Sequence, residues 1–288
     1  MKRTIAGTIL GTIISATPAA ATSITLGTGA NVAAITPFRD TFRLEIGGGT
    51  IAGANGSFVD ATGARREINW DGVPSQFSAP NNMPANFFNV NSPRGAVFAT
   101  PGTGFQVSGA TTDAGAGQPA APNFGNIDAS YSATFASFSP QRLFTALNST
   151  ITDVNFFVPG TNIPGVTSAF GVIFSDVDLF GPTTLQFFDP FNALLQTVIV
   201  PNLVGNQTFS FAGVVFDSPV VSRVRITSGN VALGAGVTDQ NGLTRDVVVM
   251  DDFLYAEPVA AVPEPATLGL IGVGLVALAR RHRARARG

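Results

Sequence analysis

Short apolar runs rich in Val, Ile, Phe and Thr recur along the chain, and Gly, Pro, Asn and Asp separate them. Breaks spaced by roughly 8 to 12 residues are typical of β-strands joined by turns. In the second half the pattern predicts strands at residues 169–177, 184–189, 194–200, 208–216, 220–227 and 246–255. Weaker signals predict strands at residues 41–46, 66–70, 95–100, 105–108 and 130–135.

No stretch of helical length between residues 22 and 258 has apolar residues spaced by three and four positions without an internal Gly or Pro. We therefore predict an all-β fold, a two-sheet β-sandwich of jelly-roll type. One domain over residues 22–258 is the preferred organisation, and two small sandwiches divided near Asn148 are the alternative. The 24 phenylalanines all lie in this region and are expected to fill the space between the sheets.

The first 21 residues have the parts of a secretory signal peptide. Lys2 and Arg3 are positively charged, residues 5–14 form an apolar core, and residues 17–21 end in the small side chains that suit cleavage. We expect residues 1–21 to form a signal helix that is removed on export.

Residues 259–288 form a second terminal signal: a Pro-Glu-Pro turn, an apolar stretch at 266–279 and a basic tail at 280–288. As a helix, the 14 apolar residues would be about 21 Å long, which is short for a hydrocarbon core of roughly 30 Å. The tail arginines would stay on the cytoplasmic side of a membrane. The segment therefore suits a short hydrophobic helix that holds the chain transiently and is then removed.

This arrangement resembles the PEP-CTERM sorting signal of bacterial envelope proteins. The resemblance implies an exosortase-type sorting protease and the secretion machinery as partners. It also implies delivery to the cell surface or the extracellular matrix, and it says nothing about what the rest of the chain does. The residues that carry the motif are Pro263, Glu264, Pro265, Arg280 and Arg281.

The region between the two signals is acidic and lacks two reactive residue types. It holds nine arginines, no lysine and 17 acidic residues, which gives a formal charge of −8, and this disfavours binding to nucleic acid. The chain has no cysteine, and its single histidine, His282, lies in the basic tail. Catalysis by Ser-His-Asp or Cys-His groups and zinc sites built on nitrogen or sulfur are therefore excluded.

Carboxylates remain as candidate ligands, and calcium takes six to eight oxygens. Asp176 and Asp178 lie two positions apart and would share a strand face, whereas the adjacent Asp251 and Asp252 would face opposite sides. The closing segment 250–255 is also similar to the last strand of jelly-roll carbohydrate-binding modules, in which an Asp helps to hold a structural calcium ion. These aspartates are candidate ligands of a structural calcium ion, and strand ends with turn formation are the other interpretation of the same residues.

A polysaccharide site would need an aromatic face beside hydrogen-bonding groups. Trp70 with Asp71, Asn69 and Arg66 is the best local combination, and a Trp packed into the core at a strand end is the alternative reading. A glycosidase would need two carboxylates about 5–10 Å apart, and no pair stands out in the sequence.

The sequence therefore predicts an exported, surface-sorted, non-enzymatic protein of the envelope or extracellular matrix, with adhesion, matrix structure or polysaccharide binding as its role. No catalytic residues are predicted. A secreted, carboxylate-dependent polysaccharide-active enzyme and a structural matrix protein without a ligand are the alternatives.

Overall fold

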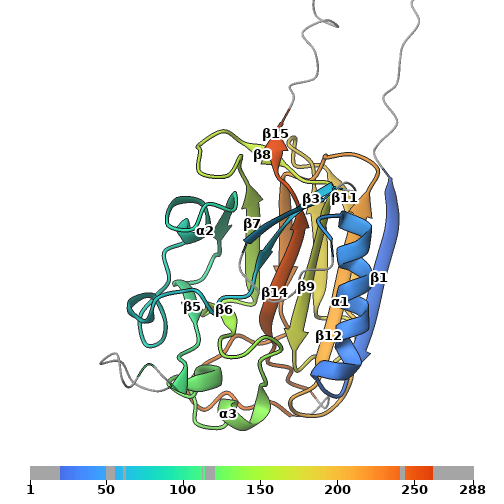
Figure 1. The fold of residues 1–288 in the computed structure, drawn as a ribbon. Helices are drawn as coiled ribbons and strands as arrows, with labels where there is room; N and C mark the ends of the chain where they lie inside the picture. Colours follow the sequence, from blue (N-terminus) through green and yellow to red (C-terminus); the bar gives the residue numbers. More distant parts are fainter. Residues whose placement is uncertain are drawn as a thin grey trace, which may run out of the picture.

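The structure is a computed structural model that describes residues 20–49, 56–60, 63–111, 113, 121–240 and 244–261. The described chain is mostly β-structure in antiparallel sheets (Figure 1), which confirms the predicted all-β class. The jelly-roll connectivity stays a prediction. The C-terminal hydrophobic helix lies outside the described residues, and so does the signal helix apart from its last two residues.

The larger sheet has eight strands. Two of them share one edge of β14: β3 pairs with its second half and β6 with its first half. The order is β1 (Ala21–Gly29), β12 (Phe209–Phe216), β9 (Ala169–Ser175), β14 (Val249–Ala256), β3 (Gly63–Ile68) and β2 (Gly56–Asp60). Off this path, β6 (Phe144–Leu147) pairs with β14, and β5 (Gly104–Val107) pairs with β6.

The smaller sheet has five strands, and a two-stranded ribbon accompanies it. The strand order of the five-stranded sheet is β11 (Leu194–Ile199), β10 (Thr184–Phe188), β13 (Arg223–Thr227), β7 (Ile151–Phe156) and β4 (Ala96–Ala99). In the two-stranded ribbon, β8 (Gly165–Val166) pairs with β15 (Val259–Ala260). The six strands predicted in the second half are all present, with ends shifted by at most three residues.

One core lies between the two sheets. In β7 and β10 every second residue is buried, as expected for strands with one face on the core. Strands from both sides of Asn148 pair within each sheet, because β4 pairs with β7 and β3 pairs with β14. The buried side chains of both halves therefore form one continuous cluster.

A helix covers the outer face of the larger sheet where a strand was predicted. Residues 41–46 are the last part of α1 (Val32–Ile46), so that prediction was wrong. The Asn31 side chain caps the helix by accepting a hydrogen bond from the Ala34 N–H at 3.0 Å. Pro37 lies inside the helix and had excluded the segment from the helical pattern.

Packing against the sheet explains why α1 forms despite its proline. The ring of Phe42 lies on Gly171 of β9 and Gly213 of β12, where a Cβ atom would come within 2.8 and 2.7 Å of that ring. Ile35 and Ile46 join the same buried cluster. Figure 1 shows α1 lying along the larger sheet near β1 and β12. The glycines thus provide a smooth surface for the helix, and burial of its apolar side stabilises it.

The second misassigned strand, residues 130–135, contains the short helix α3 (Tyr131–Thr134). Tyr131 is fully buried, and its hydroxyl donates to the carbonyl of Val237 at 2.6 Å. Other short helices in the described part of the chain are η1 (Ser75–Phe77), α2 (Phe87–Val90) and η3 (Pro122–Phe124). Among the described residues, no helix combines the length and apolar character needed to span a bilayer.

Candidate functional site

The structure buries the aromatic residue that was predicted to stack on sugar. Trp70 is completely inaccessible, and its ring lies parallel to that of Phe144 with centroids 4.0 Å apart. Phe88 and Phe253 contact the indole edge-on, and its Nε1 donates to the carbonyl of Asp251 at 2.8 Å. The indole is therefore a core side chain, as the alternative reading of the sequence had it, and the hypothesis of a stacking face for sugar was wrong because Trp70 is completely buried.

The three polar neighbours of Trp70 also have structural partners. Asp71 accepts the N–H groups of Gln141 and Arg142 at 2.7 and 3.1 Å. Arg66 forms a bidentate ion pair with Glu257, with both N–O distances 2.6 Å. Asn69 is buried, and its carbonyl accepts the Ser139 hydroxyl. These residues hold loops and strands together and do not converge on a common ligand position.

The adjacent carboxyl groups of β14 do not face opposite sides, contrary to the prediction. A β-bulge between Met250 and Phe253 changes the register, and such a bulge re-aims side chains. Asp251 and Asp252 thereby both reach the hydroxyl of Ser139, at 3.0 and 2.8 Å.

The same pair is completely buried. Burial and the neighbouring carboxyl raise the pKa of Asp251 well above its usual range, and burial raises the pKa of Asp252 to about 6. A carboxyl pair of this kind shares hydrogen bonds within the protein and is not arranged as part of a calcium site with Asp176 and Asp178.

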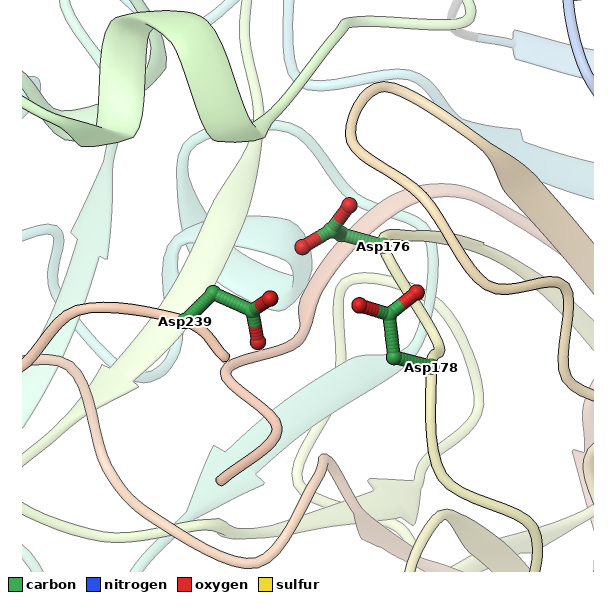
Figure 2. Close-up of side chains that lie close together, drawn as sticks. All are labelled: Asp176, Asp178 and Asp239. Atoms are coloured by element: carbon green, nitrogen blue, oxygen red, sulfur yellow. The ribbon is translucent and has the colours of Figure 1, made fainter. Parts of the chain in front are cut away.

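Asp176 and Asp178 instead meet a third aspartate, Asp239, from a distant part of the chain. Each aspartate offers one carboxylate oxygen, and these three oxygens all lie within 4.8 Å of one another. Figure 2 shows the three carboxylates turned toward a common point. Asp176 directly follows β9, and Asp239 comes from the loop before β14. We call these three residues the aspartate cluster.

Backbone contacts fix the aspartate cluster in place. Asp176 has a left-handed backbone (φ 72°), which is uncommon for a residue other than glycine, and its N–H donates to the Thr208 carbonyl at 3.0 Å. Asp178 accepts the Gly205 N–H at 2.8 Å through Oδ1. Asp246, just before β14, accepts the N–H groups of Asp178 and Leu179 at 3.1 and 3.2 Å. The cluster therefore joins three loops at one end of the larger sheet.

The cluster is electrostatically unfavourable by itself. Burial, together with repulsion from Asp178, Asp239 and Asp246, raises the pKa of Asp176 to about 9. The pKa of Asp178 and that of Asp246 each rise to about 6, with burial as the main cause. Among the described residues, Asp176 and Asp178 form no ion pair that would offset this repulsion.

The sequence identified two members of this cluster but missed Asp239 and the supporting Asp246. Their spacing of two residues predicted that Asp176 and Asp178 lie on one face. Asp239 lies in a loop more than 60 residues further along the chain. The pattern of apolar and polar residues gives no indication that Asp239 lies near Asp176 and Asp178, because only the tertiary structure places the loop before β14 beside the end of β9.

A surface groove lies at the other end of the domain, beside the β8–β15 ribbon. It has a volume of about 280 Å³, and its lining includes Asn155, Asp189, Asn192 and Arg223. Phe191, between the lining residues Pro190 and Asn192, is 78% exposed.

The guanidinium group of Arg223, which lines the groove, is fixed by several contacts. Arg223 contacts Asp153 at 2.9 Å and Asn192 at 2.5 Å, and it lies 3.8 Å above the ring of Phe188. The groove thus combines oriented amide and guanidinium groups with a neighbouring exposed aromatic ring.

Comparison with known proteins identifies the chain end. Residues 261–284 match the PEP-CTERM protein-sorting motif, which supports an exosortase-substrate signal and marks an exported, surface-sorted protein. The match includes the predicted Pro263, Glu264, Pro265, Arg280 and Arg281, and all but Ala261 of the matched segment lies outside the described residues.

The remainder of the chain has little similarity to characterised proteins. No curated protein matches it. Among solved structures, the enzymatically active domain of Bacteriophage CBA120 tailspike protein 4 aligns at 14% identity with a TM-score of 0.22. That alignment covers 65% of this chain and 22% of the tailspike chain, so this chain corresponds to less than a quarter of that protein.

Proposed function

We propose that this exported, surface-sorted protein is a non-enzymatic component of the cell envelope or extracellular matrix that binds polysaccharide in the groove beside Phe191. The sorting motif supports the destination. The observation that carries the ligand class is the exposed ring of Phe191 next to the groove, because sugar faces pack on aromatic rings while amides and guanidinium groups bind hydroxyls.

The groove is better suited to binding than to hydrolysis. Glycoside hydrolysis uses two carboxyl groups that flank the scissile bond. Among the described residues, the lining contains one carboxylate, that of Asp189, and it accepts the N–H groups of Phe191 and Ala193 at 2.8 and 2.7 Å. This carboxylate shapes the turn between β10 and β11 and presents Phe191 beside the groove.

The sorting segment complements this role. The apolar residues 266–279 would hold the precursor briefly in the membrane, and an exosortase-type protease would then release a mature domain of residues 22–258 and a few following residues. The β8–β15 ribbon fixes the point where the sorting segment leaves the domain, since the Ala261 N–H donates to the Pro164 carbonyl at 3.1 Å. The first strand begins and β15 ends at the same end of the domain (Figure 1).

A glycan array probed with the purified protein, followed by calorimetry on the best ligand, tests the binding proposal. Phe191→Ala should weaken binding about fivefold or more, because an aromatic contact contributes on the order of 1 kcal/mol. Phe180→Ala is the matched control, since Phe180 is 71% exposed in a different loop. A silent array, or equal binding by both variants and the native protein, would instead favour a structural matrix protein without a ligand at this groove.

A further inference from the structure

We propose that the carboxylates of Asp176, Asp178 and Asp239 bind one calcium ion, which links the loop after β9 to the loop before β14 at one end of the larger sheet. The site lies on different loops from the polysaccharide groove and does not depend on it. Asp251 and Asp252, which the sequence had also suggested as ligands, take no part.

The first support is a set of buried oxygens that the protein itself does not satisfy. Both carboxylate oxygens of Asp176 and Oδ2 of Asp178 are buried and accept no hydrogen bond from the described residues. The N–H of Gln207, a backbone donor beside Asp176, is engaged by the carbonyl of Thr134 at 2.7 Å. Buried polar groups in native proteins nearly always have a partner, so these oxygens point to a bound group.

The second support is geometric. A calcium ion binds oxygen at 2.3–2.6 Å, so two ligand oxygens on the same ion lie at most about 5 Å apart. The candidate oxygens of the three aspartates all lie within 4.8 Å of one another. Figure 2 shows that they approach one point from three directions. A single ion can therefore contact all three carboxylates without rearrangement of the backbone.

The chemistry of the donors selects the ion. The cluster offers only hard carboxylate oxygens, with no nitrogen or sulfur, which suits calcium or magnesium. Magnesium demands a near-ideal octahedron and keeps several waters, whereas calcium accepts irregular carboxylate cages. The two buried, backbone-anchored aspartates and the partly exposed Asp239 form such an irregular set, and Asp239 leaves a route from solvent.

Binding would connect segments that are far apart in sequence. Asp178 already contacts the loop before β12 through Gly205, and Asp246 contacts the loop after β9. An ion at the aspartate cluster would add a direct link from β9 to the loop that holds Asp239. It would also neutralise most of the repulsion among the three carboxylates, so calcium outside the cell would stabilise the exported form.

The test uses the purified full-length protein after treatment with EDTA and dialysis. Titration with CaCl2 in a calorimeter should show one ion bound per chain, and the melting temperature should rise with calcium concentration. Asp176→Asn and Asp239→Asn should each weaken calcium binding at least tenfold. Asp217→Asn, which alters an exposed aspartate elsewhere, is the matched control and should bind calcium like the native protein.

The outcomes separate the proposal from its alternatives. If Asp176→Asn fails to fold, Asp239→Asn still tests the site, because Asp239 lies in a partly exposed loop. No heat of binding and identical melting in calcium and in EDTA would overturn the proposal, and Asp176 would then carry a proton. Equal affinity for MgCl2 and CaCl2 would overturn the assignment to calcium, and native-like binding by Asp239→Asn would place the ion elsewhere.

Discussion

Arg43 of α1 and Glu67 of β3 form a buried bidentate ion pair, with Nε–Oε1 and Nη2–Oε2 distances of 2.8 and 2.5 Å. Arg65 adds a second guanidinium group to the same carboxylate at 2.6 Å. The helix that the sequence pattern failed to predict is thus linked to the sheet by charge as well as by apolar packing.

Glu67→Gln should lower the free energy of unfolding by about 3–5 kcal/mol, because it leaves two guanidinium groups buried without their full counter-charge. Urea denaturation of the purified protein measures this loss. Glu257→Gln is the control, since its pair with Arg66 is partly exposed and should contribute about 1 kcal/mol or less. Equal losses in the two variants would contradict a special role for the buried pair.

Trp70→Ala should destabilise the domain by about 3–5 kcal/mol, because it removes a large side chain from the core and leaves a cavity. Thermal and urea unfolding provide the measurement. Trp70 is the only tryptophan, so its fluorescence in the native protein should be that of a buried indole and should shift to longer wavelength on unfolding. A variant of native stability that had lost only glycan binding would restore the stacking role predicted from the sequence.

The buried pair Asp251 and Asp252 should make stability depend on pH. Burial raises both folded-state pKa values above the unfolded value of 3.8: that of Asp252 rises to about 6, and that of Asp251 rises well above 3.8. The folded protein therefore holds protons that the unfolded chain releases. Stability from these groups is greatest at low pH and declines as pH rises from about 4 through 6 and beyond, by at most about 1.4 kcal/mol per pH unit for each proton.

Asp251→Asn should reduce this decline, because it removes one of the two repelling charges. Urea denaturation between pH 4 and 8 at constant ionic strength, with EDTA present, gives the slope. Asp176 and Asp246 contribute in the same direction, so the slope should become smaller without vanishing. An unchanged slope in Asp251→Asn would show that the pair does not retain protons in the folded state.

Processing at both ends predicts the mass of the protein recovered from the cell surface. The mature chain should begin near Thr22 and end close to the Pro263–Pro265 turn, and intact mass spectrometry can determine both ends. Deletion of residues 280–288 should reduce retention before sorting, since the arginines orient the apolar segment. Surface material that still contained Arg287 would indicate a permanent anchor instead of cleavage.

Local patterns in the sequence were sufficient for several features. Alternating or continuous apolar runs located β9 to β14 within a few residues, because a strand with one or two buried faces must repeat in this way. They failed for β7, whose segment ITDVNF carries an Asp and an Asn on its outer face, and for α1, whose proline hid a helix that packing stabilises. The sorting motif was fully readable, because a protease recognises it as a linear segment.

The candidate functional residues likewise fall into those that the sequence identified and those that only the tertiary structure brought together. The sequence by itself determined the export signals, the absence of His and Cys chemistry from residues 22–258, and the Asp176–Asp178 pair, all of which depend on residue type or short spacing. Only the tertiary structure added Asp239 to that pair, buried Trp70 against Phe144, and turned Asp251 and Asp252 toward one hydroxyl. These outcomes depend on the path of the loop before β14, on the packing of the two sheets and on a one-residue bulge in β14. All three involve contacts between segments that are far apart in sequence, so they leave no local periodicity in the chain.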